Sequence, residues 1–156
     1  MANTFNGLEM LKIAMLMEDE GSKYYMEGAK NASGEVKEFL LTSAKQELEH
    51  KEAFSKMYDD LLNKKGEGFE YLFEPEVMSY LRSLIDNSAF DNKGAIIKDA
   101  FKDVKSAAEE SAKAEQRTVD IYERMYEGIS DPEAKAIMKK IIDEEVAHVA
   151  YFKNLI

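Results

Sequence analysis

The sequence contains no cysteine, and only two of its 156 residues are proline. Without cysteine the chain forms no disulfide, thiolate zinc site, iron–sulfur cluster or catalytic thiol, which fits a reducing compartment. The first residues lack a basic segment followed by an apolar core, which argues against a signal peptide. No apolar run approaches the roughly 20 residues that a membrane-spanning helix needs. We therefore expect a cytoplasmic protein that does not enter a membrane.

Basic charge is also scarce: 21 Lys and Arg stand against 31 Asp and Glu, so the net charge is −10. The sequence pI is about 4.8. Such a surface repels nucleic acid and anionic lipid, and the sequence contains no basic cluster that would reverse this. Nucleic acid and membranes are therefore not expected as partners.

The composition predicts an all-α protein with one domain over residues 1–156, because Ala, Leu, Glu, Lys and Met are abundant while Val and Thr are few. Four long amphipathic segments are expected at about 4–30, 35–63, 94–127 and 132–154. They form two helical hairpins, at about 4–63 and 94–155. A crossover at 64–93 joins the hairpins, with a short helix opened at Pro75 and a loop at "DNSAFDNKG".

Each long segment carries a stripe of apolar residues that is interrupted once by a glutamate. In "IIDEEVAHVAYF", the residues Ile141, Glu145, His148 and Phe152 share one helical face. The other stripes place a glutamate in the same central position, and run from Leu8 to Ala29, from Val36 to Leu61 and from Phe101 to Met125. The fourth stripe runs from Ala134 to Leu155.

The two hairpins repeat one pattern. Glu18 precedes Glu47 by 29 residues, and Glu115 precedes Glu145 by 30. The second segment of each hairpin reads Glu-x-x-His, as "ELEH" at 47–50 and "EVAH" at 145–148, and the chain has only two histidines. The hairpins therefore resemble one unit used twice.

Four carboxylates that face one apolar core must either hold protons or share cations, because a buried unpaired charge costs several kcal/mol. A purely structural bundle with protonated acids is the alternative to a metal site. Glu and His at i and i+3 are neighbours on a helix and together suit iron, manganese or zinc. We predict a two-metal site formed by Glu18, Glu47, His50, Glu115, Glu145 and His148.

In the predicted site, Glu47 and Glu145 bridge the two metals. Glu18 and His50 complete one ligand set, and Glu115 and His148 complete the other. Each helix must then run antiparallel to its repeat, and the 64–93 segment is long enough to return the chain along the bundle.

A tyrosine follows the glutamate by seven residues in the first segment of each hairpin: Tyr25 after Glu18, and Tyr122 after Glu115. Because side chains lean toward the N-terminus of their helix, each tyrosine is expected to lean back toward its own glutamate. It would then donate a hydrogen bond to that carboxylate or be near enough to be oxidised. Plain packing of the two rings in the core is the alternative.

The six-residue pattern resembles the ferritin-like di-iron carboxylate proteins, which are four-helix bundles. The phrases "MEDEGSKYYMEGA" and "AEQRTVDIYERM" are most similar to short rubrerythrins without the rubredoxin-like domain. The resemblance implies a di-iron site that reduces hydrogen peroxide with electrons from a partner. One departure is Thr118, three residues after Glu115, where rubrerythrins carry an additional glutamate.

The resemblance implies an oxidoreductase with two iron ions, although manganese or zinc also suits the ligands. With no cysteine in the chain, the electrons must come from a separate protein such as a rubredoxin. The substrate is expected to be peroxide or dioxygen, and the protein a homodimer. Helical hairpins joined by a long crossover can also exchange between chains, which would build the site across a swapped dimer. The alternatives are ferritin-like iron oxidation and storage, and oxidation of an organic substrate.

Overall fold

The fold is an all-α four-helix bundle, seen in a computed structural model that describes residues 5–85 and 101–156. The long helices pair in sequence order, with α1 against α2 and α5 against α6. The described elements are α1 (Gly7–Lys30), α2 (Gly34–Lys65), the 3-10 helix η1 (Glu70–Phe73), α3 (Pro75–Ile85), α5 (Val104–Glu127) and α6 (Pro132–Lys153).

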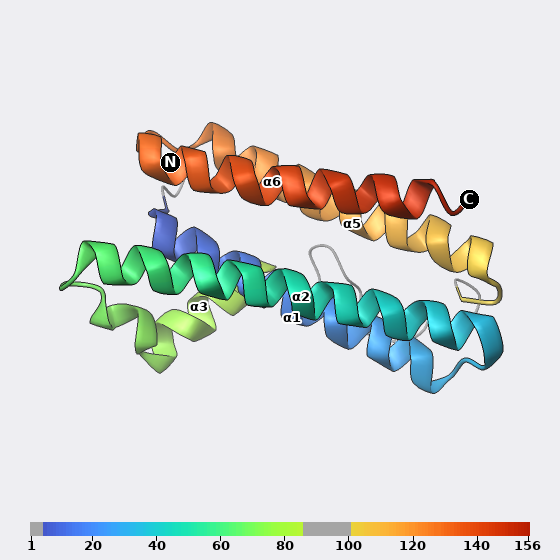
Figure 1. Cartoon of the computed structure of the whole chain (residues 1–156). Coiled ribbons are helices and arrows are strands. Elements are labelled where there is room, and N and C mark those ends of the chain that lie inside the picture. Colours follow the sequence, from blue (N-terminus) through green and yellow to red (C-terminus); the bar gives the residue numbers. More distant parts are fainter. Residues whose placement is uncertain (1–4, 86–100) are drawn as a thin grey trace.

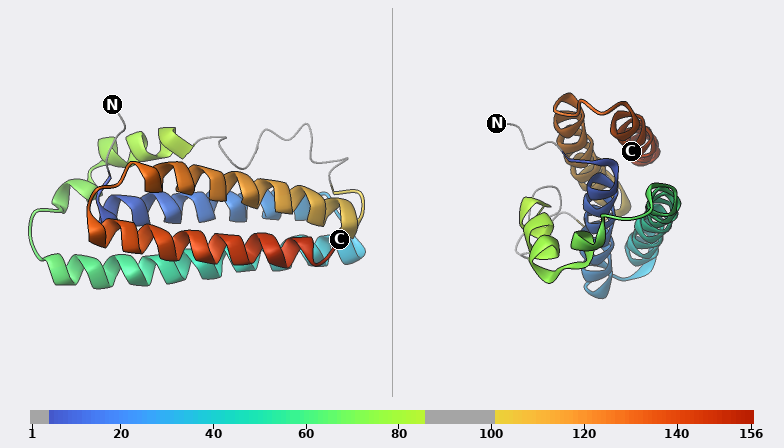
Figure 2. Two further views of the ribbon diagram at one scale, coloured as in Figure 1. Left: turned by 90° about the horizontal axis from the view of Figure 1, so that it is seen from above. Right: turned by 90° about the vertical axis from the view of Figure 1, so that its left-hand side faces the viewer.

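The two hairpins pack with each helix antiparallel to its repeat, as the site symmetry predicts. In Figure 1, α1 and α6 run in one direction while α2 and α5 run in the other. The crossover leaves α2 through η1 and α3, and α3 lies outside the bundle against α1 (Figure 2). The predicted short helix does begin at Pro75. The predicted loop at "DNSAFDNKG" lies outside the described residues.

Polar caps fix where the helices begin. The side chain of Asn6 accepts a hydrogen bond from the Glu9 amide at 2.8 Å, and Glu9 accepts one from the Asn6 amide at 3.0 Å. This reciprocal cap starts α1 at Gly7 rather than near Thr4. Asp131 caps α6 through the Ala134 amide at 2.9 Å, with Pro132 as the first helical residue.

Two expectations about the stripes are wrong. Phe101 is buried as expected but precedes its helix, because Asp103 accepts a hydrogen bond from the Ser106 amide and starts α5 at Val104. The start predicted near residue 94 is therefore too early, and residues 94–100 lie outside the described part. Leu155 is exposed because α6 ends at Lys153.

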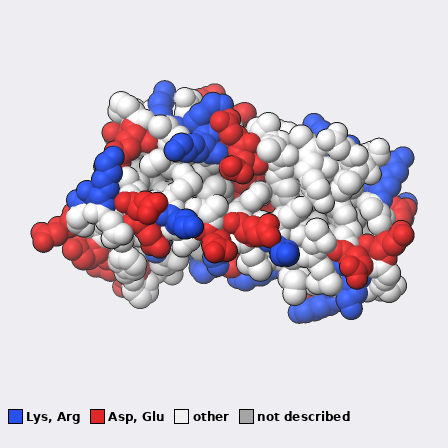
Figure 3. Space-filling model, viewed as in Figure 1, with Lys and Arg blue, Asp and Glu red and all other residues white. Residues whose placement is uncertain are grey.

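The core consists of the apolar faces of all four long helices, together with Leu72, Leu81 and Ile85 from the crossover. No described helix has the length and apolar character needed to cross a membrane. On the face formed by α2 and α6, Lys and Arg are interspersed with Asp and Glu, and an uncharged area lies over the C-terminal half of α6 (Figure 3).

We predict that the crossover helix contributes to global stability through its buried side chains, Leu81 and Ile85. Leu81 on α3 is 1% exposed, whereas Leu84 on the same helix is 40% exposed. Leu81→Ala should lower the free energy of unfolding by about 2–5 kcal/mol, because it opens a cavity. Leu84→Ala should change it by less than about 0.5 kcal/mol. Chemical denaturation measures both, and equal effects would show that α3 does not pack as described.

Candidate metal centre

The four long helices bring all six predicted ligands together in the middle of the bundle. The six come from α1 (Glu18), α2 (Glu47, His50), α5 (Glu115) and α6 (Glu145, His148). The four glutamates are at most 1% exposed and His148 is 6% exposed. His50 is the most open of the set, with its side chain 20% exposed.

The histidines lie among carboxylates from other helices. His50 Nδ1 is 3.6 Å from Glu18 Oε2 and 3.9 Å from Glu145 Oε1. His148 Nδ1 is 3.5 Å from Glu47 Oε1 and also 3.5 Å from Glu115 Oε1. The two imidazole centroids are 4.8 Å apart. The site therefore has two adjoining halves, each centred on one histidine.

Three groups within the site bring their ligand atoms within 4.8 Å of one another: Glu18, Glu47 and His50; Glu47, Glu115 and His148; His50, Glu145 and His148. Glu47 takes part in both of the first two groups. Glu145 approaches both histidines. This is the sharing that the spacing predicts for two bridging carboxylates, while the assignment of each residue as a ligand stays a prediction.

Many of the inward-facing atoms have no hydrogen-bond partner within the described residues. They include both carboxylate oxygens of Glu18 and of Glu145, one oxygen each of Glu47 and Glu115, and Nδ1 of both histidines. A buried polar group left unpaired costs about 1–3 kcal/mol. Carboxylate and imidazole donors that converge without partners fit divalent iron, manganese or zinc.

Burial sets the protonation of the carboxyls in the absence of metal. It raises the pKa of Glu18, Glu47 and Glu145 well above the usual value, and neighbouring carboxylates such as Glu115 raise them further. Burial also works to raise the pKa of Glu115. The nearby imidazole of His148 and the hydrogen bond from Tyr25 outweigh it, so that this pKa is lowered. The metal-free site thus holds protons that a cation would displace.

The structure corrects the predicted partner of Tyr25. Its hydroxyl donates a hydrogen bond to Glu115 Oε1 at 3.1 Å, across the bundle, and not to Glu18 on its own helix. The hydroxyl of Tyr122, which is fully buried, has no hydrogen-bond partner within 5–85 and 101–156. Burial raises the pKa of both tyrosines, so both remain neutral phenols.

Two further polar residues approach the site. The carbonyl oxygen of the Gln46 side chain lies 3.1 Å from His148 Nε2, a contact that the apolar stripes did not indicate. A signal was available, because Gln46 directly precedes the bridging candidate Glu47. Thr118 is buried, and its hydroxyl donates to the Ala114 carbonyl at 3.3 Å within its own helix.

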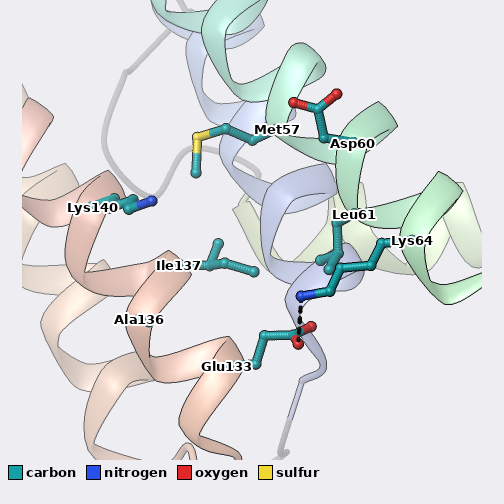
Figure 4. A pocket seen from close by; sticks show the side chains of 8 residues that line it. All are labelled: Met57, Asp60, Leu61, Lys64, Glu133, Ala136, Ile137 and Lys140. Carbon is teal, nitrogen blue, oxygen red and sulfur yellow. Dashed lines mark ion pairs between the residues drawn. The ribbon is translucent and has the colours of Figure 1, made fainter.

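A groove of about 350 Å³ lies between the end of α2 and the start of α6, away from these six residues (Figure 4). Leu61 and Ile137 line it, and Lys64 lies 3.9 Å from Glu133 across it. None of the six predicted ligands lines this groove. This groove is therefore separate from the six-residue cluster.

The comparison with protein families agrees with the site. A family model described as Rubrerythrin matches residues 9–156. The chain belongs to the rubrerythrin family. Its domain is thus the ferritin-like di-iron carboxylate domain, and family membership implies a di-iron site. Searches of curated proteins and of solved structures found no match.

The raised pKa of Glu18 gives a testable pH dependence of the metal-free protein. Since the folded state binds this proton more tightly than the unfolded state, folding stability falls as the pH rises from the unfolded pKa through the folded pKa. Metal-free Glu18→Gln should therefore have a higher Tm than the metal-free parent at pH 7, and a similar Tm at pH 4. Calorimetry at both pH values measures this, and a lower Tm at pH 7 would contradict it.

The two buried tyrosines offer a matched pair of variants. Tyr25→Phe removes a hydrogen bond to a carboxylate and should cost about 1–3 kcal/mol of stability in the metal-free protein. Tyr122→Phe removes a buried hydroxyl without a hydrogen-bond partner in the described residues, and should be neutral or stabilising. Denaturant titration measures both, and the reverse ranking would show that Tyr122 and not Tyr25 is bonded.

Proposed function

We propose that this rubrerythrin-family chain is a cytoplasmic di-iron oxidoreductase that reduces hydrogen peroxide or dioxygen with electrons from a separate donor protein. The main support is the cluster of four buried carboxylates and two histidines, whose inward-facing atoms lack partners among the described residues. A structural bundle would gain nothing from these atoms, because apolar side chains of similar volume would pack there without the cost of burying them.

The proposal assigns each residue a ligand role. Glu47 and Glu145 would bridge the two irons, because each approaches both halves of the site. Glu18 and His50 would complete one ligand set, and Glu115 and His148 the other. When bound, two ferrous ions would supply two electrons as they become ferric, which with two protons reduces one peroxide to two waters.

The surrounding residues would orient the carboxylates and admit the oxidant. Tyr25 holds its proton toward Glu115 Oε1 and so restrains that carboxylate. His50 is the site residue nearest to solvent, so we place the entry of a small oxidant on its side. Four surface grooves, beside Leu61, Arg82, Asp120 and Val149, are lined by none of the six predicted ligands, so none of these four would hold an organic substrate against the metals.

Thr118 separates this site from the fuller rubrerythrin ligand pattern. Its hydroxyl bonds to the backbone of its own helix and offers no charged ligand. We propose that the site works with six ligands and undergoes no exchange of an additional glutamate. A homodimer is part of the proposal. Storage of iron would instead need a closed shell of many subunits, so the mass in solution distinguishes the two.

Iron loading tests the proposal. Anaerobic addition of Fe(II), followed by removal of unbound metal, should leave two irons per chain. The loaded protein should then be oxidised by hydrogen peroxide and reduced again by rubredoxin. The double variant Glu47→Ala/His50→Ala should retain less than about a tenth of the iron, because it loses a bridge and a terminal ligand.

Glu49→Ala is the matched control, since Glu49 lies on the same helix segment but is exposed. It should retain both irons and full turnover with peroxide. A parent chain that holds two irons yet consumes no peroxide or dioxygen would overturn the enzymatic proposal. A double variant that binds iron as the parent does would overturn the ligand assignment.

A further inference from the structure

Gln46 contacts His148 at Nε2, the ring nitrogen that does not face the carboxylates of the predicted site. Its side-chain oxygen Oε1 lies 3.1 Å from His148 Nε2, while the other ring nitrogen, Nδ1, lies 3.5 Å from Glu47 Oε1 and 3.5 Å from Glu115 Oε1. An imidazole that binds a metal through Nδ1 must carry its proton on Nε2, and that proton needs an acceptor. The amide oxygen of Gln46 lies within hydrogen-bond distance of it.

The internal repeat places a different residue at the corresponding position of the other half. Gln46 directly precedes Glu47, as Glu144 directly precedes Glu145. Because α2 and α6 run antiparallel (Figure 1), the repeat relates the pair Gln46 and His148 to the pair Glu144 and His50. One half of the site therefore has a neutral amide at this position, and the other half has a carboxylate.

The two halves also differ in the solvent exposure and the hydrogen bonding of their side chains. His148 is bonded to Gln46, its side chain is only 4% exposed, and its neighbour Glu115 accepts a hydrogen bond from Tyr25. In the other half, the side chain of His50 is 20% exposed and neither oxygen of Glu18 has a hydrogen-bond partner within the described residues. The contact from Gln46 therefore belongs to the half whose histidine is more buried and hydrogen-bonded.

We propose that Gln46 is a positioning residue that holds the proton of His148 on Nε2 and thereby directs Nδ1 toward the metal shared with Glu47 and Glu115. Gln46 thereby strengthens metal binding beside His148 and does not affect metal binding beside His50. This inference rests on the proposed two-metal site but does not depend on the reaction carried out there.

The test uses Zn(II), which binds the same donor types and undergoes no redox change. Calorimetric titration should show two Zn(II) ions per parent chain. Gln46→Leu should weaken one of the two binding steps by about 10- to 100-fold and leave the other unchanged, because it removes the acceptor from one histidine only. Gln46→Glu keeps an acceptor oxygen at this position, so this variant should bind Zn(II) at least as tightly as the parent at both steps.

Thr42→Ala is the control, since Thr42 is exposed one turn earlier on the same helix. It should leave both binding steps unchanged. A thermal melt of each metal-free variant shows whether that variant folds. If Gln46→Leu does not fold, Gln46→Glu is the second variant at this position.

Nitrogen-15 NMR of the Zn(II)-loaded parent provides a readout that a merely structural role would not move. The His148 ring should carry its proton on Nε2 and bind zinc through Nδ1. A proton on Nδ1 would overturn the proposal, as would parent-like binding at both steps in Gln46→Leu. A parent that binds two Zn(II) but turns over no oxidant would contradict the proposed function alone. A parent that binds no metal would overturn both.

Discussion

The cost of burying four carboxyl groups in one apolar core is the constraint on which the rest of this structure depends. Glu18, Glu47, Glu115 and Glu145 are almost completely inaccessible to solvent, and most of their oxygens have no hydrogen-bond partner in the described residues. Protonation relieves the charge but leaves polar atoms in an apolar interior. A pair of divalent cations would neutralise the charge and use the lone pairs together, which explains why these residues interrupt stripes that otherwise pack well.

The topology follows from the need to bring two equivalent hairpins onto one site. If each hairpin contributes one glutamate and one Glu-x-x-His pair, the four carboxylates meet when each helix lies antiparallel to its repeat. This makes α2 parallel to α5 (Figure 1), and the chain must therefore return along the outside of the bundle between them. Leu72 and Leu81 bury the crossover against the bundle, so the return segment adds to the core.

The sequence was sufficient for the fold and for the convergence of the six polar residues, because helical periodicity alone decides which side chains face the core. It was less informative about contacts between helices. The spacing of Tyr25 pointed to its own helix, and only the packing of α1 against the second hairpin shows that its hydroxyl bonds to Glu115. Leu155 continued the stripe in the sequence, but the helix ends before it.

Gln46 shows why the apolar stripes of the sequence do not predict every polar contact of the site. It lies beside the apolar face and not within it, so its side chain meets His148 only when the two hairpins associate. The repeat still marks the position, since the residue before each bridging candidate is polar in both hairpins, as Gln46 and as Glu144. The two hairpins therefore share the inner residues and differ in the outer ones. A duplicated site can keep its ligand geometry in this way, while each half acquires its own hydrogen bonds and solvent exposure.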